Sequence, residues 1–110
     1  MNMANTFKLK TKANVGVTTT NVYVVPSATT TVVIGVTLAN TSGSSINVGI
    51  GINRGSSDDV KLMKSVPIPQ GSSFEFMGGN KIVLETTDTL VAESDVNSSL
   101  DVALTIMEIT

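Results

Sequence analysis

The acidic side chains are the groups in this sequence that could supply acid–base chemistry. The candidates are Asp58, Asp59, Asp88, Glu93, Asp95 and Asp101. A glycosidase needs two carboxyl groups that face each other across a cleft. Here the acids fall in polar turns or on the outward positions of alternating segments, and the chain has one Tyr, three Phe and no Trp to stack on a sugar ring. We therefore expect solvated turn residues and not a catalytic pair.

Other catalytic and metal chemistry lacks the residues it needs. The absence of His and Cys removes the usual base of a serine nucleophile, thiolate metal ligands and disulfides. Loop carbonyls beside Asp58, Asp59 or Asp95 could in principle bind Ca²⁺, which prefers oxygen ligands. Their spacing is not that of an EF-hand, so we expect no bound metal. Because the usual catalytic residues are missing, we also expect no enzymatic activity and no cofactor.

Positive charge is concentrated near the N-terminus. Residues 6–12 alternate, with apolar side chains on one side and lysines on the other: Phe7 and Leu9 against Lys8, Lys10 and Lys12. The lysines could dock on an acidic partner, but a solvated face or an edge protected against aggregation is the favoured interpretation. The single arginine, Arg54, lies in a polar loop and could anchor an interface.

The composition favours a subunit of an assembly. The 110 residues are enough for one domain, and 7 Lys/Arg against 9 Asp/Glu leave a net charge of −2, which argues against a nucleic-acid partner. Charged residues make up 15% of the chain, below the usual ~25%, as expected if much of the surface is covered by neighbours. No apolar run is long enough to cross a membrane, and no export signal is evident at the N-terminus.

Alternating hydrophobicity predicts strands in the middle of the chain. Residues 46–53 place Ile46, Val48, Ile50 and Ile52 on one face, with Asn and Gly on the other. Residues 29–40 place Ile34, Val36 and Leu38 inward, with Val33, Gly35 and Thr37 behind them. A polar connection of hairpin length, residues 40–45, predicts that the two segments form an antiparallel pair. Gly35, Gly49 and Gly51 are expected to permit a bulge or a close backbone approach.

The remaining segments also predict strands. The expected strands are residues 6–12, 22–25, 60–66, 72–77, 81–85, 89–93 and 100–109. Residues 60–66 could instead begin a helix capped at Ser57 or Asp58, but the following Pro67 favours extended structure. Pro69 and Gly71 suit the second and fourth positions of a type I turn, and Gly78-Gly79 predicts a hairpin. In the last segment Leu100 to Ile106 alternate inward, which leaves Met107 on the opposite face.

Eight or nine short strands with turns every 8–12 residues are typical of an all-β fold. The sequence therefore predicts an antiparallel β-sandwich, immunoglobulin-like or jelly-roll. Residues 1–12 form an N-terminal arm or first strand in this prediction, and residues 13–110 form a single β-sandwich domain.

Three stretches carry a family resemblance. Residues 22–40, 66–72 and 79–90, with the opening at residues 4–8, resemble small virion proteins of tailed bacteriophages. The resemblance implies a β-sandwich subunit of the capsid surface, neck or tail that works as an oligomer.

From these observations we expect a non-enzymatic virion protein that decorates or cements the capsid or sits at the neck, and that assembles in the host cytoplasm. Its expected partners are copies of itself, with a trimer favoured, and the major capsid or a neck or tail protein. The expected interface residues are Phe7, Lys8, Leu9, Lys10, Lys12, Val33, Arg54 and Met107. A tail-fibre or baseplate module is the first alternative. A lectin-like carbohydrate binder is the second, and the shortage of aromatic residues argues against it.

Overall fold

A computed structural model describes residues 5–55, 59–76 and 81–110 of the chain. These residues form nine β-strands and no helix, and so no helix that could cross a membrane. The strands are β1 (Asn5–Val15), β2 (Thr20–Val24), β3 (Thr30–Asn40), β4 (Ile46–Asn53), β5 (Val60–Ile68), β6 (Ser73–Phe76), β7 (Ile82–Leu84), β8 (Thr89–Ser94) and β9 (Leu100–Ile109). The predicted all-β class is confirmed.

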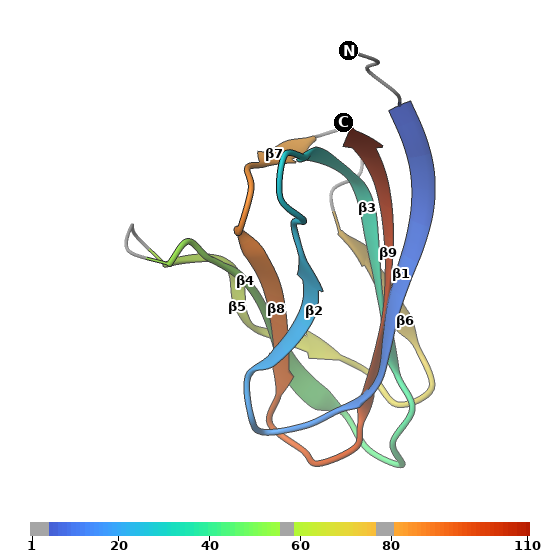
Figure 1. Cartoon of the computed structure of the whole chain (residues 1–110). Coiled ribbons are helices and arrows are strands. Elements are labelled where there is room, and N and C mark those ends of the chain that lie inside the picture. The colour runs from blue at the N-terminus through green and yellow to red at the C-terminus, as the bar shows by residue number, and fades with distance from the viewer. Residues whose placement is uncertain (1–4, 56–58, 77–80) are drawn as a thin grey trace.

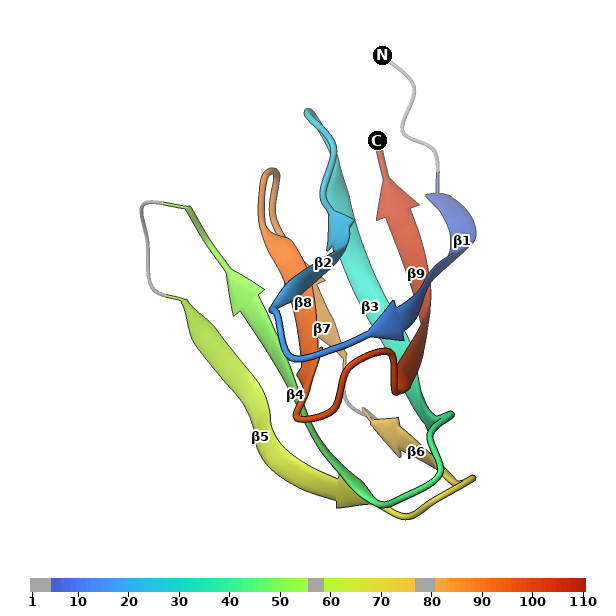
Figure 2. The same cartoon turned by 90° about the horizontal axis from the view of Figure 1, so that it is seen from below.

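The strands form two antiparallel sheets that pack face to face (Figures 1 and 2). The first, here called sheet A, has the order β1-β9-β3-β6, with β7 also paired to β3. The second, sheet B, has the order β2-β8-β4-β5. If β6 and β7 are counted as one interrupted edge strand, each sheet has four strands and the chain crosses between sheets at most connections. This is the connectivity of a jelly roll, one of the two predicted sandwich types.

The predicted pairing of the two central segments is wrong. β3 and β4 lie in different sheets, and β3 pairs with β9 while β4 pairs with β8 and β5. The connection between them crosses from sheet A to sheet B and is held by the buried Asn40 side chain. Its amide nitrogen donates to the carbonyl oxygens of Ser44 (2.7 Å) and Ile68 (2.9 Å), and its amide oxygen accepts from Ser42. A polar connection of this length fits a hairpin or a crossover equally well, so its sequence does not determine which of the two forms.

The core lies between the inner faces of the two sheets. The alternation predicted for β4 and β9 is confirmed, because each inward-facing side chain of Ile46 to Ile52 and of Leu100 to Ile106 is at most 7% exposed. In β3 the prediction is partly wrong. A β-bulge between Val33 and Gly35 shifts the register, so Val33 is fully buried with Val36 and Leu38, while Ile34 is only half-buried. An extra residue in one strand inverts the alternation on one side of the bulge.

Gly78-Gly79 lies outside the described residues, but the hairpin predicted around it does not form. β6 and β7 each pair antiparallel with β3 and therefore run in the same direction along one edge of sheet A. The predicted turn before β6 is also different in detail. The amide of Ser72 donates to the carbonyl of Pro69 (3.1 Å), which puts Gly71 at the third position, where its φ of +68° indicates a type II turn.

Extended structure is confirmed for residues 60–66. They belong to β5, at the edge of sheet B, where Pro67 is tolerated because one side of an edge strand has no ladder partner. The pairing of β4 with β5 contains two register shifts. Beside them, backbone carbonyl groups of β5 lie close to two glycines of β4. A Cβ atom on Gly51 would lie 2.9 Å from the carbonyl oxygen of Val60, and one on Gly49 would lie 3.3 Å from that of Met63. The predicted role of these glycines in close backbone approach is confirmed.

Candidate assembly interface

Most acidic side chains singled out in the sequence are occupied by local partners. Asp95 accepts from the backbone and side chain of Asn47 (2.9 and 3.3 Å), Asp101 accepts from the amide of Asn14 (3.0 Å), and Glu93 pairs with Lys61 (2.8 Å). Asp58 lies outside the described residues. Among the residues that the structure describes, no three acidic side chains gather where they could hold a metal ion.

Asp88 departs from the expectation of a solvated turn residue. It is 5% exposed, and its carboxylate accepts from the amide of Glu85 (2.9 Å) and from Nε of Arg54 (3.1 Å). The guanidinium also contacts the Glu85 carboxylate at 2.6 Å. The hydrogen bond to Asp88 is the main reason why the pKa of Arg54 is raised. Arg54 thus ties the end of β4 to the turn before β8 within its own chain.

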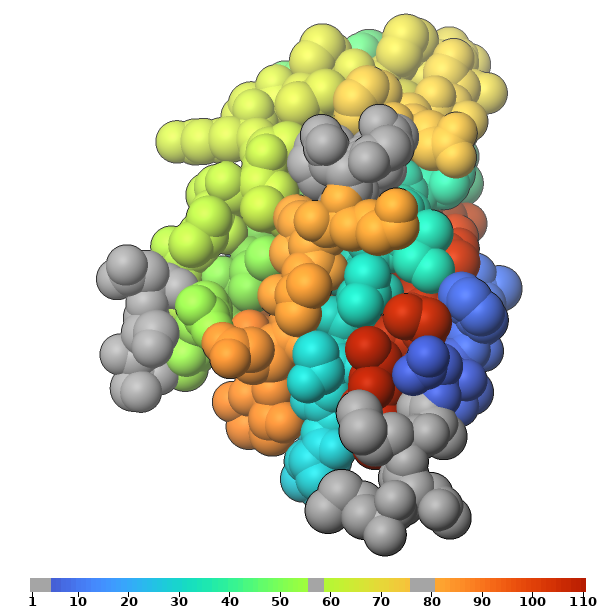
Figure 3. Space-filling model, turned by 90° about the horizontal axis from the view of Figure 1, so that it is seen from above, coloured from blue at the N-terminus to red at the C-terminus, as the bar shows by residue number. Residues whose placement is uncertain are grey.

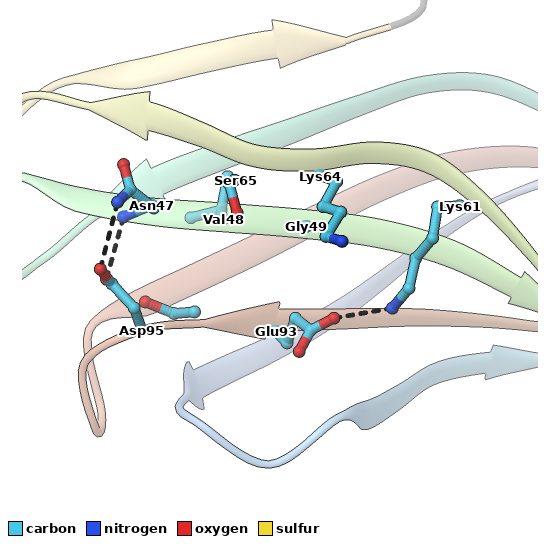
Figure 4. A pocket seen from close by; sticks show the side chains of 9 residues that line it. Asn47, Val48, Gly49, Lys61, Lys64, Ser65, Glu93 and Asp95 are labelled. Atoms are coloured by element: carbon cyan, nitrogen blue, oxygen red, sulfur yellow. Dashed lines mark hydrogen bonds and ion pairs between the residues drawn. The ribbon is translucent and has the colours of Figure 1, made fainter.

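A shallow pocket of about 390 Å³ lies on the outer face of sheet B (Figure 4). Gly49 of β4 is among the residues that line it, and Glu93 and Asp95 border it on one side. Both acids are turned to partners within the pocket, Glu93 to Lys61 and Asp95 to Asn47. The arrangement is a paired polar surface and not two carboxylates that face a substrate.

In β1 the charged side chains face the core side and the apolar side chains face outward, which is the reverse of an ordinary amphipathic edge strand. Residues that lie opposite each other in an antiparallel pair share a face. Lys8 lies opposite Ile106, and Lys10 lies opposite Leu104, so the lysines are on the core side of the sheet. Phe7 and Leu9 are on the outer side and are 70% and 66% exposed. The predicted alternation is present, but its apolar side faces away from the core.

A buried carboxylate explains this orientation. Glu108 of β9 is 5% exposed, and its Oε1 atom lies 2.7 Å from Nζ of Lys8. Its Oε2 atom accepts a 2.6 Å hydrogen bond from the hydroxyl of Tyr23, which also bonds to Thr31 (2.8 Å). Hydrogen bonding by Lys8 and then by Tyr23 lowers the pKa of Glu108. Burial, with the Glu108 hydrogen bond, raises the pKa of Tyr23 to about 12.

A cluster of four side chains connects the first strand and its neighbours in sheet A to sheet B: Lys8, Tyr23, Thr31 and Glu108. Tyr23 comes from β2 of sheet B, and the other three come from β1, β3 and β9 of sheet A. The Lys10 ammonium lies 5.9 Å from the centroid of the Tyr23 ring, within the range of a cation–π contact. Lysines on the inner side therefore fix β1 in place and leave its apolar side chains outward.

On the outer face of sheet A those side chains continue a row across four strands. Phe7 lies opposite Met107, Met107 opposite Val32, and Val32 opposite Val83. Phe7 and Val83, at the two ends, are 70% and 59% exposed, while Met107 and Val32 between them are half-buried. We call Phe7, Met107, Val32 and Val83 the apolar row. It is the structural feature best suited to contact another protein surface.

The predicted interface residues divide into four groups. Phe7, Leu9 and Met107 share the outer face of sheet A, and Lys12 on the other side of β1 is exposed. Lys8, Lys10 and Arg54 make contacts within the chain. Val33 is fully buried in the core, so its predicted place on the back of β3 is wrong, and its neighbour Val32 takes that place.

Sequence reasoning missed Tyr23, Glu108, Val32 and Val83. A signal for Glu108 was present, because the alternation from Leu100 to Ile106 puts residue 108 on the buried face. A carboxylate in that position needs a positively charged or hydrogen-bonding partner. The row formed by Val32 and Val83 depends on the register of β7 against β3, which no local pattern reveals.

No protein-family model matches the chain, and no curated protein matches it. A solved structure described as "Bacillus endospore appendages form a novel family of disulfide-linked pili" has the same fold, with a TM-score of 0.59. The match covers 98% of this chain and 88% of the other, at 13% sequence identity. These 110 residues contain no cysteine, so they cannot form the disulfide links named for that family.

Proposed function

We propose that the chain is a non-enzymatic structural subunit of a bacteriophage particle, most simply one that decorates or cements the capsid or sits at the neck. It acts as a homo-oligomer and through contacts with the major capsid or a neck protein. It assembles in the host cytoplasm, and its location is the virion.

The observation that carries this proposal is the outer face of sheet A. An apolar row with its two ends 70% and 59% exposed is a surface that gains free energy when another protein covers it. The resemblance of residues 22–40, 66–72 and 79–90 to phage virion proteins gives the biological setting. The fold shared with a pilus protein at 13% identity is consistent with a structural role.

The arrangement of polar groups favours the same class of function. The acids on the outer face of sheet B are paired with side chains of their own pocket. An enzyme would need at least one carboxylate or nucleophile directed at a substrate and close to its partner group. The chain therefore acts through its surfaces and not through a cleft.

Quantitative mass spectrometry of purified particles, separated into heads and tails, tests the proposal. We expect the protein in many copies per head, or in a smaller fixed number if it belongs to the neck. Presence only in tails would support the tail-fibre or baseplate alternative. Absence from purified particles, while the protein accumulates free in infected cells, would overturn the proposal.

A further inference from the structure

The apolar row belongs to a larger uncharged area of sheet A. The next rung along the same face is Leu9, Thr105 and Gly35, and the preceding rung is Asn5, Ile109 and Thr30. None of the described residues at these positions and in the apolar row is charged. Figure 3 views this end of the molecule, where β1 (blue), β9 (red), β3 (teal) and β7 (orange) emerge beside one another.

The charge distribution restricts the kind of partner. The lysines of β1 are on the other side of the strand, and on the outer face the acids Asp101 and Glu75 lie further along the sheet. The exposed Lys81 lies directly before β7, at the edge of this face. A partner rich in acidic groups, or a nucleic acid, would need a cluster of cations, and a single lysine at the edge does not form one. A neutral apolar surface is the complementary partner, and an identical copy of this face is such a surface.

The face also has relief that fits a second copy. A Cβ atom built on Gly35 would meet nothing within 4 Å, so the surface is open above this residue. Leu9, on the same rung, is 66% exposed, and Phe7 on the adjacent rung is 70% exposed. Protruding side chains beside an open site on one face are what two copies need to interlock about a two-fold axis.

The area is sufficient for a dimer. Three strands of sheet A are about ten residues long, and the fourth edge has four residues in β6 and three in β7. At about 4.8 Å between strands and about 3.3 Å per residue, the whole outer face covers roughly 600 Å² in projection. This area includes the part that carries Asp101 and Glu75. Side-chain relief brings this close to the ~800 Å² that each partner buries in a standard interface. A buried area of ~800 Å² is about one-eighth of the 6067 Å² of accessible surface of the chain.

We propose that two copies of this chain pack the outer faces of their A sheets against each other about a two-fold axis, with the apolar row at the centre. This inference rests on the proposed function only in taking the chain to be a homo-oligomer. It replaces the expected trimer by a dimer, because a contact between identical faces is isologous and closes with two copies.

Sedimentation equilibrium of the full chain, from micromolar to millimolar concentration, tests the dimer. Val83→Thr and Phe7→Ser should each raise the dissociation constant by roughly tenfold or more, since each change acts twice in a two-fold interface. Val24→Thr is the matched control, because Val24 is 50% exposed on β2 of sheet B. Its dissociation constant should stay within about twofold of wild type.

A second variant tests the open site above Gly35. Gly35→Val adds apolar volume where the isolated chain has space, so the fold should persist by circular dichroism while dimerisation is lost.

A wild-type chain that remains monomeric at millimolar concentration, or that sediments as a trimer, overturns the inference. Equal weakening by Val24→Thr and Val83→Thr also overturns it. Monomeric protein that is nevertheless found in particles would contradict this inference alone, whereas a dimer absent from particles would contradict only the proposed function.

Discussion

Lys8 in the first strand and Glu108 in the last strand form a 2.7 Å ion pair in which the carboxylate side chain is 6% exposed and the lysine side chain 42%. This pair determines which side of β1 faces outward. Because the lysine is on the inner side, its neighbours Phe7 and Leu9 are left on the surface. The apolar row is therefore a consequence of how the buried carboxylate is neutralised.

Replacement of Lys8 by Met should destabilise the fold by about 1–3 kcal/mol, because it leaves a buried carboxylate without its cation. Urea unfolding followed by circular dichroism measures the change. Lys61→Met is the matched control, since the Lys61–Glu93 pair is 53% and 36% exposed and should be worth less than about 1 kcal/mol. Equal effects of the two changes would contradict the role given to Lys8.

The stability of the protein should fall in acid partly through Glu108. Its pKa is lowered in the folded state by Lys8 and Tyr23, so it stabilises the fold above its unfolded pKa of about 4.3. That contribution is lost as the pH falls from there through the lower folded value. Glu108→Gln should therefore show a smaller difference in urea midpoint between pH 7 and about 3 than wild type does. An equal difference in Glu108→Gln and in wild type would contradict the role given to this carboxylate.

Tyr23 provides a direct spectroscopic readout of the same cluster. It is the only Tyr in a chain without Trp, so the rise in absorbance near 295 nm on ionisation reports this one side chain. The folded protein should titrate near the raised pKa of about 12, and protein in urea near about 10. Stability should correspondingly be full below about pH 10 and decline as the pH rises toward the folded value. A folded-state midpoint near 10 would show that the hydroxyl is not buried against Glu108.

Two glycines on outer faces should respond oppositely to alanine. Gly51→Ala should cost about 1–3 kcal/mol, because the new Cβ atom would lie 2.9 Å from the Val60 carbonyl oxygen and would push β5 away. Gly35→Ala meets nothing within 4 Å and should be neutral or stabilise by up to about 1 kcal/mol, by restricting the unfolded chain. Thermal unfolding of both variants decides the point, and a neutral Gly51→Ala would contradict the close packing of β4 and β5.

The sequence predicted strand positions well and strand partners poorly. Alternation in residues 46–53 and 100–106 identified core side chains, because burial of one face leaves a period of two. The same logic failed at Val33, because the alternation of β3 was assigned without the bulge that Gly35 was expected to permit. That bulge lies between Val33 and Gly35 and reverses the faces of β3. The logic failed again at residues 40–45 and 72–85, because a polar connection or a Gly pair does not encode whether the next strand pairs with its neighbour or crosses to the other sheet.

For the candidate interface, the sequence correctly indicated the first strand, but it did not show which side chains of that strand face outward. Phe7 and Leu9 were expected at an interface and do lie on an exposed face, while the lysines beside them are used within the chain. The apolar row needed the register of four strands, which brings together residues from positions 7, 32, 83 and 107. Such a juxtaposition is a property of the sheet order and is absent from any single segment.

The most direct test of the account is an inter-subunit distance on each face of the sandwich. The chain has no cysteine, so single nitroxide labels at Thr37→Cys on the outer face of sheet A and at Asn21→Cys on the outer face of sheet B can be compared by pulsed electron resonance. Contact through sheet A predicts a measurable inter-subunit distance for the Thr37 label that is shorter than the distance for the Asn21 label. The Asn21 labels should be more than about 30 Å apart, because they lie on the outer surfaces of four stacked sheets about 10 Å apart. A shorter distance for Asn21 than for Thr37, or no inter-subunit distance at either position, would contradict it.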